Sequence, residues 1–138
     1  MNGNNDLIMK YQEQAISTMS KGELVIALYD EVLKNLKYGS LLIKQNNTAA
    51  AGKCTTKCRN IINYLIVTLD PKYGISATLS RTYSYLLGQI ILGTAKNDAS
   101  YLDKIIPQVQ ELRDAWVQTE KKVRLSNGEN SDANGETK

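Results

Sequence analysis

The chain has 138 residues, a length typical of one domain with a single hydrophobic core. Hydrophobic residues make up 42% of the sequence and charged residues 22%, which excludes an intrinsically disordered chain. The net charge is +3, and because residues 126–138 hold three acidic residues and one lysine, residues 1–125 carry +5. This charge is too small and too dispersed for a dedicated nucleic-acid-binding protein.

The sequence also lacks the residues that most catalytic and metal sites need. It has no histidine, and Cys54 and Cys58 are its only cysteines, too few for the usual four zinc ligands. The commonest general base is therefore absent, and no glycine-rich phosphate-binding loop occurs. We expect no metal, no cofactor and no enzymatic activity, and we interpret Cys54 and Cys58 as small core residues.

No segment resembles a signal peptide or a transmembrane helix. The longest uncharged stretch, residues 82–95, is too short and too rich in Ser, Tyr and Gly to cross a bilayer. We expect a cytoplasmic protein that is not inserted in a membrane.

The first elements in chain order are a short N-terminal segment and a long helix. Residues 1–19 are predicted to form an arm or a short helix. The long helix is predicted to begin at Ser20, because Ser20 and Glu23 have the spacing of a capping box. Apolar residues then recur at helical spacing, namely Leu24, Leu28, Val32 and Leu36.

A polar connection leads to the second and third predicted helices. The second is predicted to run from about Lys53 to Asp70, where the following Pro71 disfavours helical backbone. The third covers residues 76–95 and is nearly free of charge, since Arg81 is its only charged residue.

The fourth helix is predicted to begin near Ser100, because Ser100 and Asp103 repeat the cap spacing. Pro107 predicts a kink in this helix or a later start. Residues 126–138 are rich in Gly, Asn and Ser and are predicted to be a disordered tail. Four long helices with short links predict an all-α fold, an antiparallel up-and-down four-helix bundle formed by residues 20–125.

The second and third helices carry wider apolar faces than one core stripe requires, at residues 61–66 and 86–91. The surplus either binds a partner, such as an amphipathic peptide, or thickens the core or a dimer contact. Gly88 and Gly93 lie inside the third helix; close helix packing is the simpler explanation, and room for a partner's backbone is the alternative.

Several motifs resemble the FliS family of flagellar export chaperones. Tyr11-Gln12 precedes Ser20-Lys21-Gly22-Glu23-Leu24 and Leu28-Tyr29-Asp30, as in the opening of that family, although Gly22 stands where the family usually has Glu. Leu69-Asp70, Leu79 with Tyr83, and the closing Leu112-Arg113-Asp114-Ala115-Trp116 continue the similarity, which covers about residues 8–117.

This resemblance implies a four-helix bundle that binds the disordered C-terminal segment of flagellin in the cytoplasm. It also implies that the chaperone prevents premature filament assembly and delivers flagellin to components of the type III export gate. Within the arm, the family pattern singles out Ile8 and Tyr11. The candidate flagellin-binding residues are these two and six on the wide apolar faces: Ile61, Tyr64, Leu65, Tyr83, Leu87 and Ile91.

Two other functions remain open from the residues alone. The first is a structural bundle whose broad faces pair in a homodimer, and the second is an RNA adaptor that uses the basic body. Strongly salt-dependent binding would indicate the RNA adaptor, whereas an aliphatic groove predicts weak salt dependence.

Overall fold

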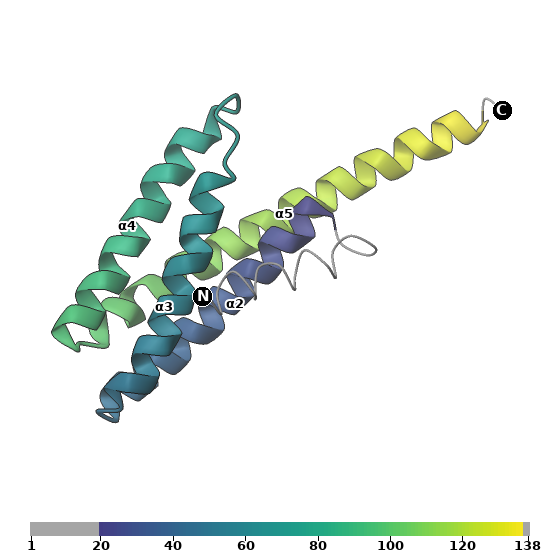
Figure 1. The fold of residues 1–138 in the computed structure, drawn as a ribbon. Helices are drawn as coiled ribbons and strands as arrows, with labels where there is room; N and C mark the ends of the chain where they lie inside the picture. The colour runs from purple at the N-terminus through teal and green to yellow at the C-terminus, as the bar shows by residue number, and fades with distance from the viewer. Residues whose placement is uncertain (1–19, 137–138) are drawn as a thin grey trace.

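The computed structural model describes residues 20–136, with side chains described for residues 20–126. Within this part of the chain all regular structure is helical, which confirms the predicted fold class (Figure 1). The helices, in order, are α2 (Lys21–Lys44), α3 (Thr48–Val67), α4 (Ile75–Lys96) and α5 (Ser100–Glu136).

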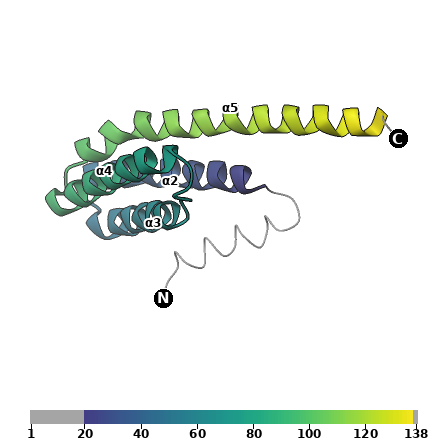
Figure 2. The same cartoon turned by 90° about the horizontal axis from the view of Figure 1, so that it is seen from above.

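The four helices pack as an antiparallel bundle. α2 packs against α3 and α5, and α4 packs against the same two helices, so that α2 and α4 occupy opposite corners. α5 is the longest helix and extends well past the ends of its neighbours (Figure 2).

One apolar stripe from each helix forms the core. On α2, the predicted residues Leu28, Val32 and Leu36 are fully buried. Burying an aliphatic side chain of this size stabilises the fold by about 1.5–3 kcal/mol. The other three helices contribute, at similar spacing, Cys58, Ile61, Ile62, Leu65, Leu79, Tyr83, Leu86, Ile90, Leu102, Ile105 and Val109.

The start of α2 confirms the predicted cap at Ser20. The Ser20 hydroxyl oxygen accepts a hydrogen bond from the amide of Glu23 at 3.1 Å, and the hydroxyl donates to Glu120 of α5 at 2.6 Å. Gly22 leaves the space that this carboxylate fills, since a Cβ there would lie 1.9 Å from Glu120 Oε2. Contact with Glu120 therefore explains why glycine is accommodated at position 22, where the family usually has Glu.

The start of α3 corrects the predicted boundary near Lys53. The helix begins at Thr48, because the Asn47 side chain accepts a hydrogen bond from the amide of Ala50 at 3.3 Å. Alanines at positions 49–51 extend this turn readily, since alanine has the highest helix propensity. The end of α3, just before Asp70-Pro71, agrees with the prediction.

The start of α5 at Ser100 agrees with the prediction, but its cap does not. Asp98 supplies the cap: its Oδ1 accepts hydrogen bonds from the amide of Ser100 at 3.0 Å and from its hydroxyl at 2.7 Å. Asp103 accepts a hydrogen bond from Ser40 and pairs with Lys44 at 2.9 Å. It therefore joins α5 to α2, and the predicted capping box of Ser100 and Asp103 is wrong.

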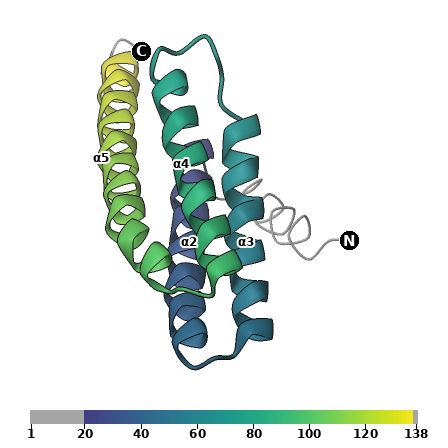
Figure 3. The same cartoon turned by 90° about the vertical axis from the view of Figure 1, so that its left-hand side faces the viewer.

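The rest of α5 contains Pro107 and extends beyond residue 126. Pro107 lies inside the helix without ending it, and the first part of α5 runs at an angle to the remainder (Figure 3). The helix continues to Glu136, through residues for which the sequence predicts a disordered tail. An existing helix extends without a new nucleation step, so even Gly, Asn and Ser can be added to it.

The described part of the chain contains neither a membrane-spanning helix nor a cluster of metal ligands. None of the helices there is long and apolar enough to cross a membrane. Between residues 20 and 126, no three side chains of His, Cys, Asp or Glu lie together as metal ligands would.

Candidate functional site

The eight predicted binding residues fall into three groups in the structure. Ile8 and Tyr11 lie outside the described residues. Ile61, Leu65 and Tyr83 are exposed by 3% or less and belong to the core. In this structure these three predicted binding residues therefore lie inside the bundle and not on its surface.

The remaining three candidates lie at or near the surface. Tyr64 and Leu87 are partly buried against the edge of the core, and Ile91 is exposed. The apolar surplus predicted for the second helix is thus largely consumed, since both Ile61 and Ile62 are buried. The surplus predicted for the third helix is not consumed, because α4 keeps apolar side chains in contact with solvent.

The outward side of α4 carries exposed apolar side chains. Tyr85, Ile91 and Leu92 are exposed by 40%, 48% and 39%. No charged residue occurs between Arg81 and Lys96. We call Tyr85, Gly88, Ile91 and Leu92 the α4 surface. Apolar surface of this kind is a common mark of a protein-binding site.

Gly88 and Gly93 differ in what surrounds them. A Cβ added at Gly93 would lie 2.6 Å from Leu102 Cδ1 and 3.2 Å from the carbonyl oxygen of Asp98, so Gly93 permits close packing, as predicted. A Cβ at Gly88 would meet no atom within 4 Å. Close packing within the bundle therefore does not explain Gly88, which opens on the same side of α4 as Leu92.

Sequence reasoning missed Tyr85 and Leu92. The available signal was their spacing around Gly88, since positions three or four residues apart lie on one side of a helix. The wider apolar stripe at residues 86–91 is the stronger pattern in the sequence, but Leu86 and Ile90 of that stripe are buried in the core.

Behind the α4 surface, a pair of tyrosines fixes the position of the helix. The hydroxyl groups of Tyr29 and Tyr83 hydrogen-bond to each other across the bundle, and both rings are buried. Burial is the main cause that raises the pKa of both phenols; for Tyr29, the neighbouring Tyr83 raises it further and a hydrogen bond with Trp116 lowers it in part. Both hydroxyls remain protonated at neutral pH and serve to join α2 to α4.

Cys58 confirms its predicted place in the core. It is fully buried, and its thiol donates to the carbonyl oxygen of Val32 at 3.6 Å. Burial raises the pKa of this thiol far above its ordinary value, which leaves it protonated and unreactive. Cys54, one turn earlier, is partly buried and also free.

Comparisons with known proteins identify the family. A family model described as "Flagellar protein FliS" matches residues 4–123. The flagellar secretion chaperone FliS of Bacillus subtilis is 30% identical over 121 residues, which cover 86% of this chain and 91% of that protein. The FliS chaperone of Escherichia coli is 32% identical over 110 residues, or 78% and 81% of the two chains. The chain therefore belongs to the FliS family of flagellar secretion chaperones, which are not enzymes.

Proposed function

We propose that the chain is a cytoplasmic chaperone that binds the disordered C-terminal segment of flagellin and prevents its premature polymerisation. In this role it delivers flagellin to the flagellar type III export apparatus. Family membership supports this assignment in general. The single observation that carries it for this chain is the uncharged, solvent-exposed α4 surface.

The chemistry of the α4 surface suits an amphipathic segment that folds as it binds. Tyr85, Ile91 and Leu92 offer apolar contacts, and Gly88 lets the backbone of a bound helix approach α4 closely. Ordering a disordered segment costs several kcal/mol, which burial of apolar surface must offset. A carboxylate or ammonium group on this surface would add a desolvation cost, and none is present.

Residues at the edge of this surface complete the proposed site. Leu87 and Tyr64 are partly buried next to the core, and we propose that they form its inner wall. The buried residues Ile61, Leu65 and Tyr83 support α3 and α4 from behind.

The proposed role of the N-terminal arm depends on Ile8 and Tyr11. We expect that replacing both with alanine weakens binding of the flagellin segment and leaves the bundle folded. Titration calorimetry together with a thermal melt checks this expectation. Unchanged affinity would refute the role assigned to the arm.

Titration calorimetry with a synthetic flagellin C-terminal peptide tests the proposal directly. Ile91→Asp and Leu92→Asp place a charge in the α4 surface and should each weaken binding by about tenfold or more, because the lost apolar burial and the desolvated carboxylate together cost more than about 1.4 kcal/mol. Leu125→Asp is the control, since Leu125 is an exposed leucine that lies on α5, away from the α4 surface.

Two results would contradict the proposal. One is equal affinity of the three variants, which would place the client elsewhere. The other is a stable dimer, found by analytical ultracentrifugation, that persists when the peptide is added but dissociates in the Ile91→Asp variant. That second result would favour the homodimeric bundle.

A further inference from the structure

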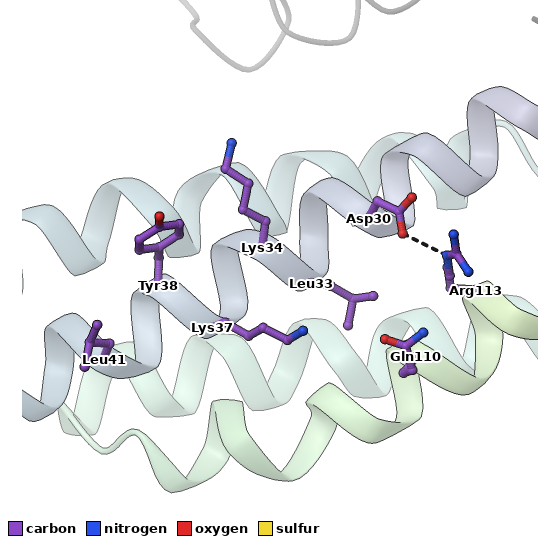
Figure 4. Close-up of a pocket in the computed structure, with 8 residues that line it drawn as sticks. All are labelled: Asp30, Leu33, Lys34, Lys37, Tyr38, Leu41, Gln110 and Arg113. Carbon is purple, nitrogen blue, oxygen red and sulfur yellow. Dashed lines mark hydrogen bonds and ion pairs between the residues drawn. The ribbon is translucent and has the colours of Figure 1, made fainter.

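A groove between α2 and α5 lies away from the α4 surface. It has a volume of about 510 Å³ and is lined by Asp30, Leu33, Lys34, Lys37, Tyr38, Leu41, Gln110 and Arg113 (Figure 4). Because α2 and α4 occupy opposite corners of the bundle, a partner in this groove would not cover the α4 surface.

The floor of this groove is apolar. Leu33 is buried beneath it, while Tyr38 and Leu41 are exposed by 55% and 49%. Two large apolar side chains one turn apart form a contact of the kind that an amphipathic helix covers. The groove follows α2 from Asp30 to Leu41, a span of about 16 Å at 1.5 Å per residue, which matches about three helical turns.

The rim of the groove is basic. Lys34, Lys37 and Arg113 line it, and Asp30 is the only carboxylate among the lining residues. Arg113 already binds Asp30 at 2.8 Å, and this pair closes one end of the groove (Figure 4). Arg113 and Asp30 offset each other, which leaves the two lysines as the net charge of the groove.

The two lysines remain able to bind anionic groups. Lys34 contacts Glu31 on the same helix at 3.7 Å, a long ion-pair distance, and the Lys34 side chain stays 60% exposed. Lys37 forms no ion pair with any residue between 20 and 126. On the helical repeat, both lysines lie beside Tyr38 and Leu41, so each can meet a carboxylate on a helix that covers those two side chains.

We propose that the α2–α5 groove is a docking site for an acidic amphipathic helix of a second protein, distinct from the flagellin client. Leucine-like residues of that helix pack on Tyr38 and Leu41, and its flanking Asp or Glu side chains pair with Lys34 and Lys37. The client and this second protein bind at the same time. The groove would keep this function whether or not the α4 surface binds flagellin.

Backbone NMR titration of the full chain tests the proposal with two 15-residue helical probe peptides. One peptide has leucines along one side and glutamates beside them, and the other has lysine in place of each glutamate. The acidic peptide should give saturable shifts at residues 30–41 and 110–113, and it should bind at least tenfold more tightly than the basic peptide.

Charge-reversal variants provide the control. The double variant Lys34→Glu/Lys37→Glu should weaken the acidic peptide at least tenfold. Lys53→Glu/Lys57→Glu makes the same change at two exposed lysines of α3 and should have less than a twofold effect. Thermal melts of both variants check that the bundle stays folded.

Four results would overturn the proposal. The first is equal binding of the two peptides, and the second is a set of shifts on α4 only. The third is competition between the acidic peptide and the flagellin peptide, which would assign the groove to the client. The fourth is that a second copy of the chain, or a vesicle containing 30% anionic lipid, produces the same shifts at residues 30–41 as strongly as the peptide.

Discussion

The hydroxyl groups of Tyr29 and Tyr83 satisfy each other inside an apolar core. Replacing Tyr29 with phenylalanine leaves the buried Tyr83 hydroxyl without its partner, which costs about 1–3 kcal/mol. Replacing Tyr83 should cost less, because the Tyr29 hydroxyl keeps its hydrogen bond with Trp116. Replacing both removes both polar groups, so the double variant should lose less stability than the sum of the single variants. Urea unfolding followed by the fluorescence of Trp116 measures this coupling; strictly additive losses would show that the pair is not a unit.

Gly88 and Gly93 provide a matched pair on one helix. Gly88→Ala should raise the free energy of unfolding by about 0.5–1 kcal/mol, because alanine favours the helix and its Cβ meets open space. Gly93→Ala should lower it by about 1–3 kcal/mol, because the added Cβ would crowd Leu102 and the backbone of Asp98. Thermal melts of the two variants check the ranking, and destabilisation by Gly88→Ala would show that α4 is packed more closely there.

The binding residues were harder to predict than the helices that carry them. Helical spacing shows that Ile61 and Leu65 belong to an apolar face, but it does not show how wide an arc the neighbouring helices cover. In the structure that arc buries them and also Ile62. The neighbouring helices cover a narrower part of the α4 circumference, so that both Ile91 and Leu92 remain exposed. Which apolar residues remain exposed therefore depends on how the helices pack, which the spacing of residues along one helix does not determine.

At the scale of the helices, Asp103 joins α5 to α2. The hydrogen bond from Ser40, and then the charge of Lys44, hold the pKa of the Asp103 carboxyl below its ordinary value of 3.8. A carboxyl with a lowered pKa in the folded state stabilises the fold above about pH 4, and this contribution is lost as the pH falls through the folded-state pKa.

Asp103→Asn therefore tests this link between helices. The variant should be less stable at pH 7, by less than about 1 kcal/mol because the pair is partly exposed. The difference from the unmodified chain should shrink as the pH falls from 5 to 3. Thermal melts across this range measure the difference, and a gap that stays constant with pH would contradict the assigned ion pair.

Apolar periodicity predicted all four described helices, and Ser20 and Asp70-Pro71 predicted one start and one end. The errors lie where short-range chemistry allows alternatives. Asn47 caps α3, so that this helix begins at Thr48, five residues before the expected start at Lys53. Asp98 rather than Ser100 caps α5. Such caps depend on side-chain geometry, which spacing alone does not determine.

At the scale of the whole molecule, the two proposed surfaces differ in charge. Binding of the flagellin peptide to the uncharged α4 surface should weaken less than threefold between 0.05 and 0.5 M NaCl, because there is little charge for salt to screen. Binding of the acidic peptide to the lysines of the α2–α5 groove should weaken at least tenfold over the same range. Fluorescence anisotropy with labelled peptides measures both, and a steep salt dependence of the flagellin peptide would contradict binding on α4.

The most direct measurement of client binding is methyl NMR of the chain in complex with the flagellin C-terminal peptide. Labelled methyl groups of Ile91 and Leu92 report on the α4 surface, and those of Leu41 report on the opposite corner of the bundle. We expect intermolecular nuclear Overhauser effects from the peptide to Ile91 and Leu92 and none to Leu41. Effects at Leu41 with none on α4 would contradict this expectation.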